Sequence, residues 1–201
     1  MNPFEPLLSW LSGLFRGAGG LSGGAGATAP FEAEDPRAAL NIEAGIAAIR
    51  ACEGTNTPIA YRALYGYHPR LNPTRLFDSY DDHPRKRFMF DGTPIPDGVK
   101  PKPYSYTTAA GALQITESTF DRVTRIIGRR DFSPASQVEI GKFLIEEAGA
   151  LDDLRAGRLT SFAAKCSPIW ASFPMSKSGQ PKHSMDFVRK AYRAAGGEEA
   201  K

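Results

Sequence analysis

The sequence of 201 residues offers little thiol or imidazole chemistry: it has two cysteines and three histidines. Two cysteines do not make a disulfide framework, and Cys52 and Cys166 are either two buried free thiols, which we favour, or one pair. His68, His83 and His183 are isolated, and no histidine or cysteine shows the spacing of a metal site. We therefore expect no metal and no cofactor.

A long apolar run and a basic N-terminal start are also missing. No stretch reaches the ~20 apolar residues of a membrane-spanning helix, so we expect no transmembrane segment. Residues 1–15 contain no Lys or Arg, unlike a secretory signal, so another route would have to deliver the protein outside the cytoplasm. The net charge of +3 is scattered along the chain, whereas a nucleic-acid-binding protein would more often concentrate it in a stripe. We expect no nucleic-acid partner.

Glycine is concentrated near the N-terminus, where residues 17–33 predict a flexible linker. Before it, residues 1–16 carry apolar side chains at helical spacing and predict a short amphipathic helix. An isolated helix of this length is marginal in water, so we expect it to dock. A protein partner is the favoured target, and the main domain or a membrane surface are the alternatives. The main domain covers residues 34–201.

Several helices are predicted in the main domain from the apolar spacing and from start and stop residues. The first begins at Asp35-Pro36 and ends at Glu53, with Leu40, Ile42, Ile46 and Ile49 on its apolar face. The later helices are expected at residues 116–127, 133–149, 160–166 and 184–195. Their inward side chains are expected to be Phe120, Val123, Ile127, Ile140, Leu144, Ile145, Phe187, Val188, Ala191 and Tyr192.

Residues 57–108 differ from the rest, because they show no helical period and are rich in Tyr, Phe, Pro, Gly and Asp. Ile59–Leu64, Arg87–Phe90 and Tyr104–Thr107 could form short strands. The predicted fold class is therefore α+β, with a mainly helical lobe and a small β-rich lobe. A cleft between such lobes suits an extended substrate.

Glu53 lies at the end of the first predicted helix, directly before Gly54. The negative end of the helix dipole and partial burial both disfavour a carboxylate, and both raise the pKa of such a side chain. An acid that stays protonated near neutral pH can give a proton to a glycosidic oxygen. Position alone favours the ordinary alternative, a solvated Glu at a helix end, and other parts of the sequence reverse that preference.

Four stretches of the main domain form an ordered set: residues 52–55 (CEGT), 76–86 (LFDSYDDHPRK), 109–115 (AAGALQI), and 131–137 with 166–174 (DFSPASQ and CSPIWASFP). In their order and approximate spacing they resemble the bacteriophage lambda endolysin family of lysozyme-like lytic transglycosylases. The resemblance covers about residues 41–197. One departure is Leu113, where the family usually has Tyr.

The resemblance implies a lysozyme-like fold and an enzyme that degrades peptidoglycan. Such an enzyme would cleave the MurNAc-GlcNAc bond and leave a 1,6-anhydro end, with Glu53 acting first as acid and then as base. The nearest alternative is a hydrolytic muramidase on the same bond, which would use a second carboxylate, and Asp81 and Asp82 are the candidates. The alternative of a different class is a non-catalytic glycan-binding or structural module of a virion.

Five residues are expected to bind the glycan: Thr55, Tyr80, Gln114, Ser167 and Trp170. The amide of Gln114 can donate to and accept from sugar hydroxyls or an N-acetyl group, although it could instead bond nearby backbone. Tyr80 and Trp170 offer aromatic faces to sugar rings, but aromatic side chains at such positions more often belong to a core. Ser167 could contact the glycan or cap the turn that follows it.

Asp82, His83 and Arg85 are expected near the cleft in a structural role. Asp82 and His83 could form an ion pair that orients the lobe. Arg85 could brace the rim of the cleft, which we favour, or meet a carboxylate of a wall peptide.

The resemblance and the N-terminal segment together suggest how the protein reaches the wall. A phage-encoded enzyme of this kind would act on peptidoglycan in the periplasm, delivered with the virion or after the host membrane has been permeabilised. A docking helix and a long linker suit an enzyme carried in a phage particle, so we expect residues 4–15 to bind a tail or capsid protein. The alternative is a weakly hydrophobic membrane-targeting segment.

Overall fold

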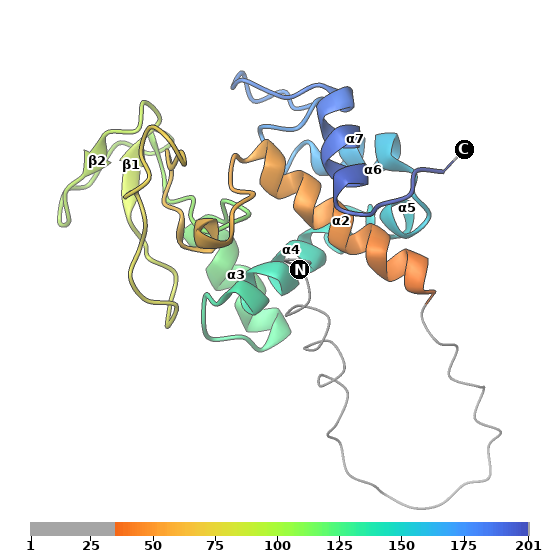
Figure 1. Cartoon of the computed structure of the whole chain (residues 1–201). Coiled ribbons are helices and arrows are strands. Elements are labelled where there is room, and N and C mark those ends of the chain that lie inside the picture. Colours follow the sequence, from red (N-terminus) through yellow and green to blue (C-terminus); the bar gives the residue numbers. More distant parts are fainter. Residues whose placement is uncertain (1–34, 201) are drawn as a thin grey trace, which may run out of the picture. The chain divides into compact units, whose positions relative to one another are not determined.

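The computed structural model describes residues 35–200. The docking helix predicted at residues 1–16 and the linker predicted at residues 17–33 lie outside the described residues. The elements are α2 (Pro36–Cys52), the 3₁₀ helix η2 (Pro58–Arg62), β1 (Arg87–Met89), β2 (Pro94–Ile95), β3 (Tyr106–Thr107), α3 (Glu117–Ile127), α4 (Pro134–Glu147), α5 (Leu151–Arg155), α6 (Leu159–Cys166) and α7 (Met185–Ala194). Figure 1 shows the strands on one side and α2, α5, α6 and α7 on the other. The α+β prediction, with a helical lobe beside a small β-rich lobe, is confirmed.

Short polar side chains set where the helices begin. Thr116 precedes α3 and accepts a hydrogen bond from the backbone N–H of Thr119, and Ser133 and Ser184 cap α4 and α7 in the same way. Gly128 ends α3 with a φ of 73°, a left-handed conformation that costs glycine little. The predicted helices are therefore confirmed, with ends that agree to within about two residues. The sequence does not predict α5, which is five residues long and has no capping side chain.

A small antiparallel sheet lies between α2 and α3 in the chain, with its strands in the order β2-β1-β3. Phe88 at the centre of β1 pairs with Pro94 of β2 and with Thr107 of β3. The strands predicted at residues 87–90 and 104–107 are confirmed, although both are shorter than predicted. Pro94 is tolerated because β2 is an edge strand, where a missing backbone N–H breaks no ladder.

The strand predicted at Ile59–Leu64 is wrong, because this segment forms the 3₁₀ helix η2. Pro58 occupies the first turn of η2, and its ring holds φ close to the helical value. Ile59 is exposed on this turn, whereas Ala60 is fully buried. The apolar side chains of the segment therefore do not alternate across a sheet.

The helix α2 lies at the centre of the helical lobe, where it packs against α4, α5 and α7. Ile42, Ile46 and Ile49 are buried, as predicted. Gly45 permits the close approach of α5, since an added Cβ would lie 2.4 Å from Cδ2 of Leu154. The packing on several sides fixes the direction of α2, and with it the position of Glu53 at its C-terminal end.

Two side chains predicted to face the core are exposed instead: Leu40 is 46% exposed and Phe187 is 38% exposed. Leu40 lies two residues before Ile42, so about 200° of rotation separates them and they cannot share one face. Phe187 stacks on His183, with ring centroids 4.1 Å apart, while the adjacent Val188 is buried. In both helices the buried face is narrower than the apolar pattern of the sequence.

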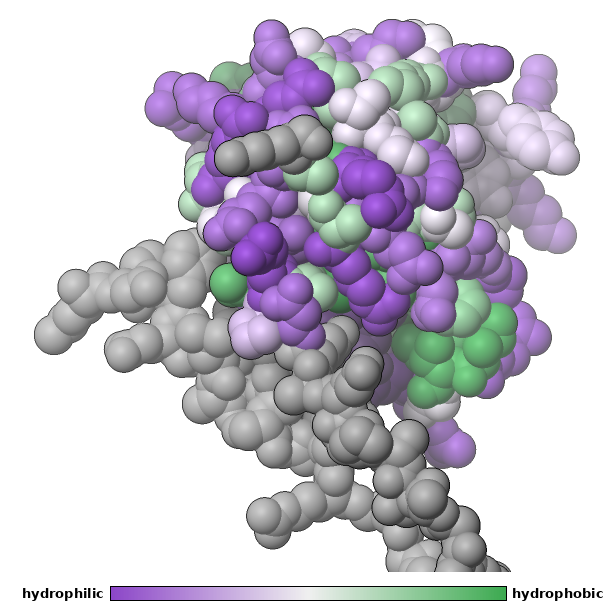
Figure 2. Space-filling model, turned by 90° about the vertical axis from the view of Figure 1, so that its right-hand side faces the viewer, coloured by the Kyte–Doolittle hydropathy of each residue, from purple (hydrophilic) through white to green (hydrophobic). Residues whose placement is uncertain are grey.

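The buried apolar side chains form one cluster to which every helix from α2 to α7 contributes. Figure 2 shows one face of the molecule, which is mainly hydrophilic and has a compact hydrophobic group near one edge. Within residues 35–200, no helix combines the length and the apolar character needed to cross a membrane.

Candidate active site

The end of α2 presents Glu53 at a sharply turned backbone. Glu53 is the C-cap residue that directly follows Cys52, the last residue of α2, and Gly54 comes next with a φ of 69°. The N–H of Gly54 donates to the carbonyl of Ala51 at 3.1 Å, and the N–H of Thr55 donates to the carbonyl of Arg50 at 2.8 Å. These two bonds form the Schellman motif that closes a helix. The glycine predicted to stop the helix therefore does so, directly after Glu53.

Burial dominates the chemistry of Glu53. Burial raises the pKa of Glu53 above its ordinary value of 4.5, because the charged form is poorly solvated. The hydroxyl of Ser172 donates a hydrogen bond of 2.5 Å to Oε1 of Glu53, which lowers the pKa by a smaller amount. The raised pKa agrees with the sequence prediction, and burial is its main cause.

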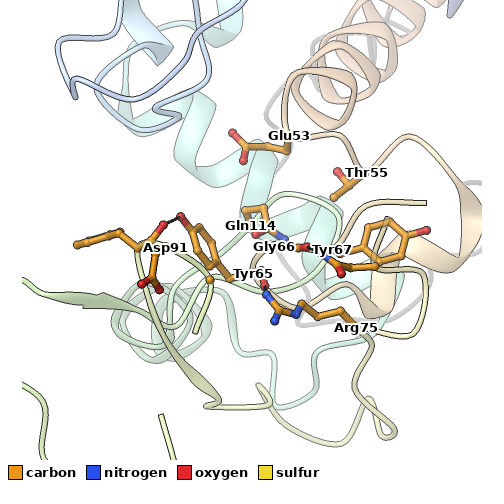
Figure 3. A pocket seen from close by; sticks show the side chains of 11 residues that line it. Glu53, Thr55, Tyr65, Gly66, Tyr67, Arg75, Asp91 and Gln114 are labelled. Atoms are coloured by element: carbon orange, nitrogen blue, oxygen red, sulfur yellow. Dashed lines mark hydrogen bonds between the residues drawn. The ribbon is translucent and has the colours of Figure 1, made fainter. Parts of the chain in front are cut away.

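A cleft of about 330 Å³ opens beside Glu53. Its walls consist of Glu53, Thr55, Tyr65, Gly66, Tyr67, Asn72, Arg75, Phe90, Asp91, Gly92 and Gln114. Figure 3 shows Glu53 on one side of this space, Tyr65, Arg75 and Asp91 across from it, and Gln114 between them. The end of α2 and the loop before α3 therefore form one wall, and the β-rich lobe forms the other.

The wall opposite Glu53 carries a second carboxylate. Asp91 lies in the turn between β1 and β2, where it accepts a hydrogen bond of 2.8 Å from the backbone N–H of Thr93. Hydrogen bonds from Thr93 lower the pKa of Asp91. The hydroxyl of Tyr65 donates to the carbonyl of Phe90 at 3.0 Å and so ties this turn to the cleft wall. The two carboxyl groups of the cleft thus have pKa values shifted in opposite directions.

Two of the residues predicted to bind glycan line the cleft with Glu53. Thr55 is buried, and its hydroxyl lies 2.6 Å from the carbonyl of Ala112, which links the end of α2 to the loop before α3. Gln114 has a φ of 48°, a strained conformation for a residue with a side chain, and such strain is concentrated at functional sites. Its Nε2 donates to the carbonyl of Gly111 at 2.9 Å, so part of the amide is used locally.

The other three predicted glycan-binding residues lie outside this lining. Trp170 is buried and donates from Nε1 to the carbonyl of Leu113 at 3.0 Å. Ser167 is also buried and donates to the carbonyl of Ala163 at 2.6 Å. Tyr80 is half-buried and packs edge-on against Phe77, with ring centroids 5.7 Å apart. Their predicted contact with glycan stays a prediction, and the contacts seen are those of core residues.

Arg85 is surrounded by carboxylates. Its Nε lies 3.1 Å from Asp82, its Nη1 lies 3.0 Å from Glu117, and its Nη2 lies 2.8 Å from Asp121. These bonds join the segment before β1 to α3. They agree with the bracing role favoured for Arg85, and they leave little of its guanidinium for a wall peptide.

His83 is fully packed inside the protein near Arg85. Its Nε2 lies 3.0 Å from the carbonyl of Ile115, and its Nδ1 accepts a hydrogen bond from the backbone N–H of Arg85. The ring packs against Phe120 and Phe132. Burial lowers the pKa of His83, so the neutral ring with its proton on Nε2 fits this site. The predicted ion pair with Asp82 therefore gives way to a neutral hydrogen-bonded histidine.

Sequence reasoning misses the hydrogen-bond partner of Glu53 and several residues that line the cleft. Ser172 belongs to a stretch that carries the family resemblance, but nothing in the sequence links it to Glu53. Tyr65, Arg75 and Asp91 lie in the irregular segment, where no periodicity indicates which side chains share a face. Only the folded chain brings them together.

Both cysteines are free and buried. Burial raises the pKa of Cys52 to about 12, and the neighbouring Glu53 acts in the same direction. Burial also raises the pKa of Cys166 to about 12. These thiols are therefore poor nucleophiles. Among residues 35–200, no group of three or more His, Cys, Asp or Glu side chains is arranged to hold a metal ion.

Comparison with known proteins adds an independent finding. The family model described as Endolysin matches residues 43–199, which is more than half of the chain. The chain belongs to the endolysin family. It is 36% identical to the endolysin of Escherichia phage P2 over 125 residues, which cover 62% of this chain and 72% of that one. It is 34% identical to the endolysin of Escherichia phage lambda over 145 residues, covering 72% and 84%.

Solved structures agree with this membership. The lysozyme of bacteriophage lambda complexed with a chitohexasaccharide matches with a TM-score of 0.66 and 28% identity, covering 80% of this chain and 97% of that one. Another structure of lysozyme from bacteriophage lambda matches with a TM-score of 0.62. The protein is therefore a phage endolysin with a lysozyme-like fold, and it is a glycosidase that degrades peptidoglycan.

Proposed function

We propose that this endolysin is a lytic transglycosylase that cleaves the MurNAc-GlcNAc bond and leaves a 1,6-anhydro end. The observation that carries the proposal is Glu53, a carboxyl with a raised pKa in the wall of a cleft, beside one hydroxyl donor. A protonated carboxyl can serve as acid, and the same group after ionisation can serve as base. The lambda lysozyme complexed with a chitohexasaccharide supports a glycan as the occupant of the cleft.

The proposed reaction has two proton transfers at Glu53. The carboxylic acid first gives its proton to the glycosidic oxygen, and the bond from that oxygen to the anomeric carbon breaks. The 6-hydroxyl oxygen of the same muramic acid then bonds to the anomeric carbon, and its proton passes to the Glu53 carboxylate. Because the nucleophile belongs to the substrate, part of the entropic barrier is already removed. The acid is restored and no water is consumed.

Product analysis tests this proposal directly. Purified peptidoglycan digested by the protein is expected to yield anhydro ends by mass spectrometry. Glu53→Gln is expected to lower the rate about 10²–10⁴-fold, because proton transfer supplies about that much. Glu146→Gln, at an exposed position near the end of α4, is the matched control and should keep full activity. Reducing ends as the sole product would refute the transglycosylase assignment.

Hydrolysis of the same bond is the second candidate, and the position of Asp91 favours it. Neither candidate from the sequence lines the cleft, and each has a partner elsewhere, Ser79 for Asp81 and Arg85 for Asp82. Asp91 lines the wall across from Glu53 and could activate a water, as a second carboxylate does in an inverting glycosidase. Asp91→Asn separates the two mechanisms. A transglycosylase should still form anhydro ends, whereas a hydrolase that depends on Asp91 should lose its reducing-end product.

A non-catalytic module is less consistent with the cleft. The departure at Leu113 gives that alternative some standing if the missing aromatic side chain belongs to the substrate site. Leu113 is 1% exposed, and its Cδ1 packs against Gly141 of α4. Leu113 is therefore a core residue here, and its identity does not bear on the chemistry at Glu53.

We also propose that the enzyme acts in the periplasm and that a phage particle carries it there. The support is the amphipathic pattern of residues 4–15 and the glycine-rich segment that follows, as read from the sequence. The particle protein bound by this segment would be a tail or capsid component. Delivery after permeabilisation of the host membrane is the alternative route.

A further inference from the structure

One cationic side chain lines the cleft and has no part in the proposed reaction. Of the described residues that line the cleft, Arg75 is the only positively charged one. It lies on the β-rich side, across the space from Glu53 (Figure 3). Its guanidinium is permanently charged and carries five N–H donors in a planar arrangement. A charge of this kind in a glycan-binding cleft requires an explanation.

The contacts of Arg75 hold its head in place without neutralising it. Nη1 donates to the carbonyl of Tyr65 at 3.2 Å, and the guanidinium carbon lies 5.0 Å from the centre of the Phe88 ring. The head also lies close to two glycines, since an added Cβ would be 2.4 Å from Nη1 at Gly66 and 3.3 Å from it at Gly92. Any larger residue at Gly66 would have to displace the arginine head.

Among residues 35–200, no Asp or Glu forms an ion pair with Arg75, although many other arginines of the chain have such partners. Arg85 shows the contrast most clearly, because three carboxylates surround it. Asp91 lines the same cleft as Arg75 but is bonded to Thr93 instead. No carboxylate among the described residues therefore neutralises Arg75.

We propose that Arg75 binds a carboxylate on the lactyl arm of the muramic acid. The proposal rests on the glycan-cleaving function above and names the group by which the cleft distinguishes peptidoglycan from an uncharged amino-sugar polymer. The sugar rings of both polymers are neutral, whereas peptidoglycan carries carboxylates on the lactyl group or on the attached peptide. Guanidinium and carboxylate match in charge and geometry and form two parallel hydrogen bonds. Arg75, rather than Arg85, is then the arginine that meets a carboxylate of the peptidoglycan.

Binding to three glycans tests the proposal. Every protein in this test is the full-length chain with Glu53→Gln, so that no probe is cleaved. The first probe is a chitohexasaccharide, which has no carboxylate. The second is a peptide-free glycan fragment with a free lactyl carboxylate, and the third is a peptide-bearing fragment. Adding Arg75→Gln should weaken binding of a carboxylate-bearing probe about tenfold, since a hydrogen bond to a charged group is lost. Binding of the chitohexasaccharide should stay unchanged and thereby report an intact cleft.

Two further variants sharpen the result. Arg75→Lys keeps the charge and should restore part of the affinity, and rising salt should narrow the difference between Arg75→Gln and its parent. Arg70→Gln removes the same charge from an exposed position on the same lobe and should change nothing. A loss confined to the peptide-bearing probe would assign the carboxylate to the peptide, and a loss on the peptide-free probe would assign it to the lactyl group. An equal loss on all three probes, or no loss at all, would overturn the proposal.

The binding test of Arg75 does not depend on whether the glycosidic bond is cleaved by transglycosylation or by hydrolysis. Reducing ends in the product analysis would refute the transglycosylase and leave the Arg75 result intact. Anhydro ends together with equal binding by Arg75→Gln and its parent would refute the Arg75 proposal alone.

Discussion

At the scale of single residues, the cleft holds two carboxyl groups whose surroundings differ. Burial raises the pKa of Glu53, whereas hydrogen bonds from Thr93 lower the pKa of Asp91. A pair of carboxyl groups shifted in opposite directions is a common basis for dividing acid and base roles. Ser172 moderates the difference, because its hydroxyl favours the ionised form of Glu53. If Glu53 is the proton donor, we expect the balance between burial and this one hydrogen bond to set the pH range in which it can donate.

Ser172→Ala is expected to extend activity to higher pH. The substitution removes a bond that stabilises the carboxylate, so the pKa of Glu53 rises further. Activity is lost as the pH rises through the pKa of the acid, and the alkaline limb of the kcat/KM profile should therefore move upward. At the optimum the loss should be less than about tenfold, because the proton donor is still present.

Ser79→Ala is the matched control, since it removes an exposed hydrogen bond between Ser79 and Asp81 outside the cleft. Its pH profile should coincide with that of the unchanged protein. An alkaline limb that stays in place in Ser172→Ala, or moves to lower pH, would contradict the role assigned to the serine.

At the scale of elements, α4 joins the parts of the chain that surround the cleft. Gln137 of α4 is fully buried, and its Nε2 donates to the carbonyls of Tyr61 and Phe132 at 2.9 and 2.8 Å. Its Oε1 accepts from the N–H of Ala112 at 2.8 Å. One side chain thereby links η2, the loop before α4 and the loop that carries Gln114.

Gln137→Ala is expected to destabilise the protein by about 3–5 kcal/mol, because three backbone groups would lose their partner inside the protein. The free energy of unfolding in urea measures this loss. Gln180→Ala, at an exposed position, should stay within about 0.5 kcal/mol of the unchanged protein. A similarly small effect of Gln137→Ala would show that water or a neighbouring group replaces the amide.

The helices other than α5 were predictable, mainly because local residues mark where they begin or end. Thr116, Ser133 and Ser184 supply caps, and glycines mark the ends, so the boundaries need no tertiary information. The segment at Ile59–Leu64 fails for the opposite reason, since a short apolar run fits a strand or a turn equally well until its neighbours are known. The place of Glu53 at a helix end alone favoured a solvated side chain, and only the family resemblance singled it out as the candidate acid. Its hydrogen bond to Ser172, 119 residues away, has no signal in the sequence.

At the scale of the whole molecule, the residues proposed to carry out cleavage all belong to the described fold. The buried cluster runs from α2 to α7, and Glu53, Ser172 and the cleft lie within residues 35–200. The two structures of lambda lysozyme align over 97% of their length with 80% of this chain. We therefore expect the N-terminal segment to direct the protein to its site of action and to take no part in catalysis.

Deleting residues 1–30 is expected to leave activity on isolated peptidoglycan unchanged and the melting temperature within about 1 °C, because none of the described core is removed. The same deletion should abolish co-purification with phage particles.

Replacing Leu7 and Leu11 by Asp in the full-length chain is a second test, since it breaks the apolar stripe and keeps the linker. It should also abolish co-purification, because a docking helix binds through that stripe. A truncated protein that still accompanies the particles would place the docking contact in residues 31–201, and flotation of the full-length chain alone with lipid vesicles would instead favour a membrane surface as its target.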